Sequence, residues 1–359
     1  MKILIVGGSV RDIFLGTVSR DSDYLVIDGT KEEFLEKFPN AKEVGKAHTV
    51  YLVGRSEYSF PRGGSIENDL RLRDLTINAM ALGDAGKLYH HPQALKDIEL
   101  KVLRPASAQS FFEDPLRVFR AARFFATLNG FSVHKQLLLV MSKASQENLL
   151  ESIAAERVGQ EMLIVMADGS PGRFFSLLSR TNCLRPWFSE LADLRGSGPS
   201  GKKGNLEIHF LPTDGRHTTR FRRLTNWLAL AVHLPDKFQV QSLSDKIRLP
   251  LRFKKAGCAA KALFADACRY NELDLSERVH FLRNLHSSSI LAQLLRVVQL
   301  NTGKRFNEVV ERDMQAFLSV NLPPDLHNMG AGSGKALHEL RIKALEYAAK
   351  EKPIDGDSV

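Results

Sequence analysis

The chain has 359 residues, 43% hydrophobic and 25% charged, a globular mix that excludes a collagen-like or fully disordered protein. Its three cysteines have no CxxC spacing, which favours reduced thiols in a cytoplasmic protein over a disulfide scaffold or zinc finger. No stretch approaches the ~18 consecutive apolar residues of a membrane-spanning helix, so we expect no membrane partner.

Positive charge is concentrated in one part of the chain. The net charge is +9, and residues 201–255 hold 12 basic side chains against 4 acidic ones. Such a stretch is either a solvated basic face or a surface that follows the phosphates of a nucleic acid. On the second interpretation, the RNA-binding candidates are Lys202, Lys203, Arg222 and Arg223.

Short apolar runs alternate with helical patterns over the first hundred residues, as in a domain that mixes strands and helices. Gly7-Gly8 ends the first run, and Thr30 suits the N-cap of a helix. We predict strands at Ile3–Val6, Tyr24–Ile27, Thr49–Val53 and Tyr58–Phe60, and helices at Val10–Leu15 and Thr30–Phe38.

Beyond about Ala106, strand signals almost vanish and apolar residues recur at helical spacing. The glycine-rich segment Gly196–Gly204 is typical of a flexible hinge. We predict helices at Pro115–Leu128, Lys135–Lys143, Ala155–Met166, Arg173–Leu178, Arg222–Val232, Lys255–Arg269, Ser287–Leu300 and Glu339–Lys350.

The segment Val6–Asp12 places a glycine pair between a predicted strand and a predicted helix. Glycine lets backbone N–H groups approach a phosphate closely, and Arg11 can add a fixed positive charge. The spacing differs from the GxGxxG pattern of dinucleotide-binding proteins. A purely structural tight turn is the alternative.

Asp21 and Asp23 stand two positions apart at the start of a predicted strand, so their side chains face the same side. Two carboxylates this close repel each other unless a cation lies between them, and Mg²⁺ is commonly held by one or two carboxylates and substrate phosphates. Asp21 and Asp23 are therefore the catalytic and metal-binding candidates, with Glu57 on a neighbouring strand as the other candidate ligand. A solvated acidic turn is the alternative.

Basic side chains also flank the apolar stretch within Asp69–Ala79. Arg71 and Arg73 can reach phosphate or ribose, and Asp74 can orient Arg73 through a bidentate pair.

A fourth group of polar residues begins at Asp114, which we expect near the N-cap of a helix because proline follows it. Asp114 and Arg117 would then be neighbours on the helix surface, where they form either an ion pair or a reader of a nucleobase edge. Arg120 and Arg123 continue the basic row.

Taken in order, these motifs resemble class II tRNA nucleotidyltransferases and bacterial poly(A) polymerases of the polymerase-β superfamily. The resemblance covers about residues 1–190 and is carried by Gly7–Asp12, Asp21 with Asp23, Arg73–Ala79, Glu113 with Asp114 and Arg117, and Glu156-Arg157-Val158 with Glu161.

This resemblance implies an α+β N-terminal nucleotidyltransferase head with a small mixed sheet, followed by an all-α neck, body and tail. We place these parts at 1–105, 106–168, 169–270 and 271–359, with tRNA along the helical parts. The resemblance also implies Mg²⁺ at Asp21 and Asp23, and nucleotide contacts from Gly8, Arg11, Arg73, Arg120 and Arg123, with Asp114 and Arg117 as the amino-acid template for the incoming base.

The sequence departs from the family pattern in two places. It has no His-Asp pair, so the phosphohydrolase domain of some relatives is not expected. In addition, only residues 63–68 separate Arg62 from Asp69, where CCA-adding members have a longer flexible loop associated with switching from CTP to ATP.

We therefore expect a template-independent enzyme that extends tRNA 3′ ends with CTP, releases pyrophosphate and adds the terminal A poorly or not at all. The alternatives are a full CCA-adding enzyme that also uses ATP, a poly(A) polymerase, and a non-catalytic RNA-binding protein. The last would need the basic body but not Asp21 and Asp23.

Overall fold

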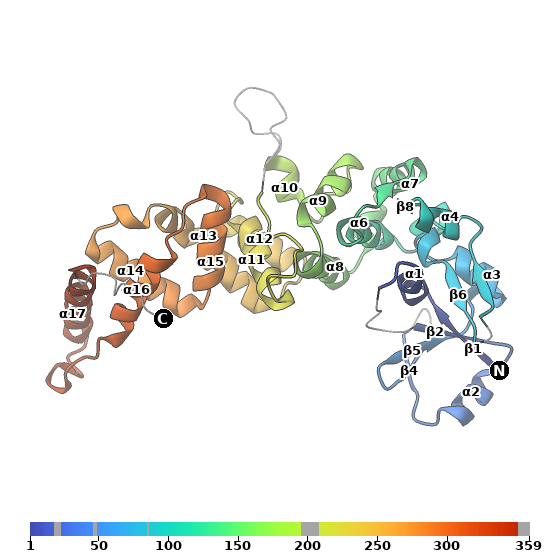
Figure 1. Ribbon diagram of the computed structural model, residues 1–359, viewed down its shortest axis with the longest axis horizontal. Helices are drawn as coiled ribbons and strands as arrows, with labels where there is room; N and C mark the ends of the chain where they lie inside the picture. Colours follow the sequence, from blue (N-terminus) through green and yellow to red (C-terminus); the bar gives the residue numbers. More distant parts are fainter. Residues whose placement is uncertain (18–22, 46–48, 85, 195–207, 351–359) are drawn as a thin grey trace, which may run out of the picture. The chain divides into compact units, whose positions relative to one another are not determined.

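The computed structural model describes residues 1–17, 23–45, 49–84, 86–194 and 208–350. The chain forms two compact units (Figure 1): unit 1 comprises residues 1–165 and 171–189, and unit 2 comprises residues 166–170 and 190–359. The predicted hinge Gly196–Gly204 lies outside the described residues, and the four-part division into head, neck, body and tail stays a prediction.

Unit 1 contains a mixed sheet, as the sequence predicts. Its strand order is β3-β4-β5-β2-β1-β6-β7, in which β2 and β5 are parallel and the other neighbours antiparallel. The strands are β1 Lys2–Val6, β2 Asp23–Ile27, β3 Lys42–Val44, β4 Val50–Val53, β5 Ser56–Ser59, β6 Met80–Leu82 and β7 Leu88–His90, and a separate pair joins β8 Val102–Leu103 to β9 Ser132–Val133.

The central strand β2 sends consecutive side chains to opposite faces of the sheet, as strand geometry requires. Leu25 packs in one apolar cluster with Leu70, while Val26 packs in another with Phe34. The predicted N-cap at Thr30 is confirmed, because its side chain and that of Glu33 form a reciprocal capping box. Both faces of the strand that carries Asp23 are therefore anchored.

Helices surround this sheet and continue beyond it in unit 1. They are α1 Gly8–Phe14, α2 Lys31–Lys37, α3 Ile66–Arg71, α4 Ala94–Glu99, α5 Ala108–Glu113, α6 Arg117–Thr127, α7 Lys135–Gln146, α8 Ala155–Asp168 and α9 Pro171–Arg180, with 3₁₀ turns η1 Arg62–Gly64, η2 Thr76–Asn78 and η3 Leu149–Ser152. The helix predicted from Pro115 begins at Arg117 instead, because the preceding residues make a turn in which Arg117 N–H donates to Asp114 O.

Helices joined by loops make up unit 2, with no strand among its described residues. Its elements are α10 Ser189–Leu194, α11 Thr219–Ala231, α12 Lys237–Lys246, α13 Leu251–Cys268, η4 Tyr270–Glu272, α14 Leu275–Ser288, α15 Leu291–Thr302, α16 Asn307–Ser319, η5 Pro324–Leu326 and α17 Ala331–Lys350. The helix predicted at Ser287–Leu300 is present as α15 but begins later, at Leu291, because Ser289 adopts a left-handed conformation with φ 54° and separates α14 from α15.

Two expectations from composition can be compared with the fold. Cys183, Cys258 and Cys268 are all free thiols, and burial raises the pKa of the Cys183 thiol to about 12. None of the helices in the described ranges combines the length and the apolar character needed to cross a membrane.

Candidate active site

The glycine turn between β1 and α1 lies against two predicted site residues. Gly7 has φ +75°, and a Cβ atom built on it would lie 2.8 Å from Arg73 Nη1 and 4.0 Å from Asp23 Oδ2. A side chain at this position would therefore strain the backbone and collide with the Arg73 guanidinium. The turn brings Gly7, Asp23 and Arg73 together, although they come from three separate motifs.

Arg11 lies just behind this turn and is held by hydrogen bonds. The residue is 8% exposed, and its Nη1 donates to Asn78 Oδ1 at 2.7 Å. Its Nε and Nη2 donate to Asp12 Oδ1 at 2.9 and 2.7 Å. A Cβ atom on Gly8 would lie 3.4 Å from Arg11 Nη2, so Gly8 and Arg11 are neighbours.

Asp23 is the first residue of β2 and is in register with Glu57 on the parallel strand β5. Residues paired in this way project from the same face of a sheet, so the sheet places the two carboxylates on one side. Asp21 lies outside the described residues. Within the described residues, no group of three or more His, Cys, Asp or Glu side chains has the geometry to hold a metal ion.

Arg73 is oriented by Asp69 and not by Asp74, so that prediction is wrong. Asp69 is 2% exposed and accepts from Arg73 Nε at 3.1 Å and from Arg62 Nε at 2.8 Å. Burial opposes ionisation of Asp69, but the charges of Arg73 and Arg62 outweigh burial and lower the pKa of its carboxyl. The physical reason is local spacing: Asp69 lies in α3, and Arg73 follows in the turn just after that helix, where Arg73 N donates to Leu70 O. The two side chains, four residues apart, therefore meet.

Asp74 points away from Arg73 and links the segment that follows it to α6. Its carboxylate accepts from Leu75 N at 2.8 Å, Asn78 Nδ2 at 2.9 Å and Arg120 Nε at 2.9 Å. Burial would raise the pKa of Asp74, but the charge of Arg120 and these hydrogen bonds hold the pKa well below its ordinary value. Arg120 is therefore fixed by an acid 46 positions away.

The side chains of Asp114 and Arg117 do not form an ion pair with each other. Asp114 ends α5 and accepts from Arg157 Nη1 and Nη2, both at 3.1 Å. Arg117 is 9% exposed, and its Nη1 donates to the Arg73 carbonyl at 3.3 Å. Asp114 lies two residues before Leu116, the N-cap residue of α6, and Arg117 lies next to the backbone of Arg73.

One aromatic ring has three arginines around it, a feature that sequence reasoning missed. The Phe124 ring is 7% exposed, and the guanidinium carbons of Arg123, Arg11 and Arg120 lie 4.1, 5.2 and 5.8 Å from its centroid. Arg123 also pairs with buried Glu161 of α8. The recurrence of arginine around Phe124 in the α6 sequence is the signal that could have revealed it. Phe124 is a common support for three predicted nucleotide contacts.

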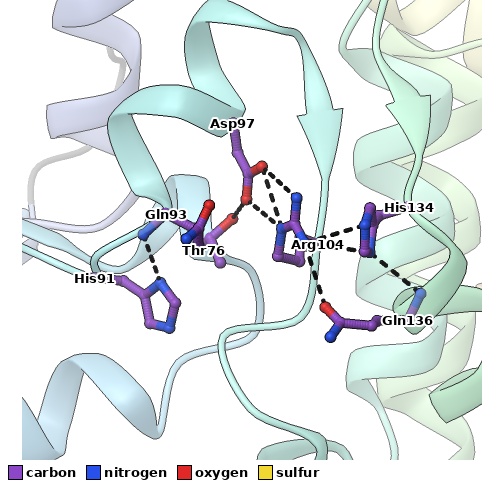
Figure 2. A network of polar contacts seen from close by, with 7 residues as sticks. All are labelled: Thr76, His91, Gln93, Asp97, Arg104, His134 and Gln136. Carbon is purple, nitrogen blue, oxygen red and sulfur yellow. Dashed lines mark hydrogen bonds and ion pairs between the residues drawn. The ribbon is translucent and has the colours of Figure 1, made fainter.

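A second polar network anchors the 3₁₀ turn that follows Arg73 (Figure 2). The carboxylate of Asp97, fully buried, accepts from Thr76 Oγ1 at 2.7 Å and from Arg104 Nε at 2.9 Å. Arg104 Nη1 reaches the His134 ring at 3.0 Å, and the Nδ1 of that ring accepts from Gln136 N at the start of α7. This network fixes the segment that carries Arg73 and Asp74.

The predicted RNA-binding residues divide between the surface, the interior and the undescribed part of the chain. Arg222 is 6% exposed and donates to the carbonyls of Ala167 and Gly169, so its burial contradicts the prediction for this residue. Arg223 is half-buried. Lys202 and Lys203 lie outside the described residues.

Comparison with known proteins tests the family resemblance. Residues 130–194 match the family described as the probable RNA- and SrmB-binding site of polymerase A. The chain is 28% identical over 378 residues to the CCA-adding enzyme of Coxiella burnetii, covering 96% of this chain and 95% of that protein. The chain belongs to the class II tRNA nucleotidyltransferase family.

Two further comparisons describe this membership. The chain is 38% identical over 240 residues to the multifunctional CCA protein of Shewanella denitrificans, which is 61% of this chain and 56% of that longer protein. The crystal structure of the Bacillus stearothermophilus CCA-adding enzyme in complex with CTP has a TM-score of 0.72 at 21% identity, covering 96% of this chain and 89% of that one. The latter likeness shows that the nucleotidyltransferase fold is shared.

Proposed function

We propose that this tRNA nucleotidyltransferase adds the CCA end to tRNA, using CTP and ATP and releasing pyrophosphate. The observation that carries the proposal is the meeting of the Gly7-Gly8 turn, Asp23 and the oriented Arg73 guanidinium. A glycine turn next to a carboxylate and a fixed cation suits the triphosphate of an incoming nucleotide.

In the proposed reaction, the tRNA 3′-hydroxyl attacks the α-phosphate in line and pyrophosphate leaves. The chain's own groups position the reactants and stabilise negative charge, as in other phosphoryl transfers. Arg11, Arg120 and Arg123 around the Phe124 ring are proposed to hold the triphosphate. Since acids or amides already orient each guanidinium, little reorganisation is needed when the nucleotide binds.

The residues present fit Mg²⁺, because the sheet places the carboxylates of Asp23 and Glu57 on one side and Mg²⁺ prefers oxygen ligands. We propose that Asp23 holds the ion together with Asp21, and that Glu57 lies beside them. When bound, the ion polarises phosphoryl oxygens and lowers the pKa of the attacking hydroxyl.

Base selection is assigned to Asp114 and Arg117, which lie on either side of the turn into α6. In this structure Asp114 is paired with Arg157, and Arg117 is hydrogen-bonded to the Arg73 carbonyl. A base that hydrogen-bonds to Asp114 must replace or share its contact with Arg157. The same movement would bring Arg117 next to the base edge, since Arg117 is anchored by a single long hydrogen bond of 3.3 Å.

Two observations bear on whether the terminal A is added. The matched relatives are named for CCA addition, which favours the full reaction over addition of C alone. Against this, the short connection after Arg62 is closed by hydrogen bonds: Asn68 Nδ2 donates to Gly63 O at 2.9 Å, and Ser65 Oγ accepts from Asn68 N at 3.2 Å. We place full CCA addition first and retain CC addition as the second candidate.

Three tRNA substrates separate these candidates: one that ends before the first C, one that ends after one C and one that ends after both. With Mg²⁺, CTP and ATP present, we expect all three to reach CCA. Products that stop at C-C would establish the CC-adding alternative. Long adenylate tails on unrelated RNA would identify a poly(A) polymerase, and RNA binding without extension would identify a non-catalytic protein.

A further inference from the structure

A short motif occurs twice in the C-terminal part of the chain and is not explained by the proposed reaction. His280-Phe281-Leu282-Arg283 lies on α14, and His338-Glu339-Leu340-Arg341 lies on α17. In each motif, histidine and arginine are three residues apart and therefore share one face of their helix. The helices α14 and α17 contact each other within unit 2 (Figure 1).

The two motifs meet where these helices pack. The rings of His280 and His338 have centroids 5.4 Å apart, and Ser276 Oγ lies 3.0 Å from His338 Nε2. The Arg341 guanidinium lies over the Phe317 ring of α16, 3.8 Å from its centroid. We call His280, Arg283, His338 and Arg341 the His/Arg cluster.

The cluster contains arginine groups for which the described residues supply no hydrogen-bond acceptor or carboxylate partner. Arg341 Nε is buried and has no hydrogen-bond partner, which is costly for a charged group. Within the described residues, neither Arg283 nor Arg341 forms an ion pair with a carboxylate. The nearby buried acid Asp313 is already paired with Arg278 and Arg312.

The charges that face His338 are mostly positive. Burial lowers the pKa of His338, and His280, Arg283 and Arg341 lower it further, while Glu339 alone opposes them. An anion placed among these groups would reverse the repulsion, satisfy donors from two helices and favour the protonated imidazole.

We propose that the His/Arg cluster is a binding site for a phosphate of the RNA backbone, and that RNA binding there is coupled to proton uptake by His338. Phosphate fits better than carboxylate because its tetrahedral oxygens can accept from side chains that converge from two helices. RNA is the source that we favour over free phosphate, since the chain carries a net charge of +9 and belongs to a family that processes tRNA. To that extent the inference rests on the proposed function.

The experiment measures tRNA affinity by fluorescence anisotropy between pH 6 and pH 8 and over a range of salt concentrations. For the full chain we expect affinity to rise by roughly 3- to 10-fold as pH falls from 8 to 6, because binding favours the protonated form of His338. Arg283→Gln should reduce the salt slope by about 1. His280→Gln combined with His338→Gln should flatten the pH dependence.

Matched controls use positions on the same helices. His286→Gln removes an exposed histidine of α14, and Lys343→Gln removes an exposed cation two residues from Arg341, on a different side of α17. His286→Gln should leave the pH dependence of tRNA affinity unchanged. Lys343→Gln should reduce the salt dependence of tRNA affinity less than Arg283→Gln does. Arg283 is exposed and unpaired, so Arg283→Gln tests the proposal even if a change at Arg341 disturbs packing.

Two results would overturn the inference. RNA would bind elsewhere if two results were found together: the salt dependence of tRNA affinity in Arg283→Gln equals that of the wild type, and its pH dependence in the double histidine variant is unchanged. Binding of inorganic phosphate that the variants abolish, with unchanged tRNA affinity, would assign the cluster to free phosphate. Nucleotide addition to tRNA, measured on the same samples, tests the proposed function separately. If the wild-type enzyme adds nucleotides and the variants bind tRNA with unchanged salt and pH dependence, this inference is rejected while the proposed function stands.

Discussion

The arginines of the proposed nucleotide site and those of the His/Arg cluster use the same functional group in opposite surroundings. In the proposed nucleotide site, Arg73, Arg120 and Arg123 each pair with a buried acid. In the cluster, Arg283 and Arg341 have no such pair within the described residues. The paired guanidinium is fixed in direction and can discriminate geometry, whereas the unpaired one responds to net charge, salt and pH. The first arrangement suits a nucleotide that must be placed for chemistry, and the second suits a polymer that must be held.

The largest effect is expected where the site has a chemical role. Asp23→Asn should lower single-turnover CTP addition by about 10³-fold, since several kcal/mol of transition-state stabilisation are lost with the metal. The fold and tRNA affinity should be retained, as circular dichroism and anisotropy can check. Asp28→Asn is the matched control, because Asp28 is an exposed acid just beyond the same strand. Near-wild-type turnover in Asp23→Asn would end the metal assignment.

Removing the acid that pairs with an arginine tests whether the paired arginines depend on their buried acids. Asp74→Asn leaves Arg120 without its partner and should lower the free energy of unfolding by about 3 kcal/mol at pH 7, measured in urea. Since the folded-state pKa of Asp74 lies below the ordinary 3.8, this wild-type advantage should be complete at neutral pH and shrink as pH falls below 3.8.

Arg283→Gln provides the contrast in the same urea experiment. An exposed arginine without an acid should be replaceable within about 0.5 kcal/mol. Equal destabilisation by Asp74→Asn and Arg283→Gln would break the distinction between the two regions.

The base-selecting assignment predicts a smaller, selective effect. Arg117→Ala should raise misincorporation of UTP or purines relative to CTP by about 10-fold, because an unmet hydrogen bond at a base edge costs ~1–3 kcal/mol. Competition assays with labelled nucleotides measure the ratio. Arg180→Ala, which changes an exposed arginine of unit 1, should leave the ratio unchanged. Lost tRNA binding with unchanged selectivity would show that the template assignment is wrong.

The smallest effect is expected at the ring that supports three arginines. Phe124→Leu retains apolar volume but removes the cation–π face, so KM for CTP should rise by roughly 3- to 10-fold with little change in KM for tRNA. Phe119→Leu on the same helix removes a buried ring that packs on Phe188, and should lower Tm without changing KM for CTP. Equal behaviour of the two variants would mean that Phe124 serves packing alone.

Local sequence chemistry determined the positions of the elements and motifs. Gly7-Gly8 predicts the turn at the end of β1 because glycine accepts the conformation that the turn requires, and Thr30 predicts the start of α2 because its hydroxyl caps the helix. The mixed head sheet, the helical remainder and the family followed from such short-range patterns and their order.

Only the tertiary structure decided which charged groups are partners. The sequence alone favours Asp74 as the partner of Arg73, but Asp74 pairs with Arg120, 46 positions away, and Arg73 pairs with Asp69. Arg222 reads as a surface cation but is buried against the carbonyls of Ala167 and Gly169. The sequence determines charge and residue type, whereas burial and long-range pairing depend on how separate segments pack. Burial and pairing in turn set the orientation of each arginine and its role.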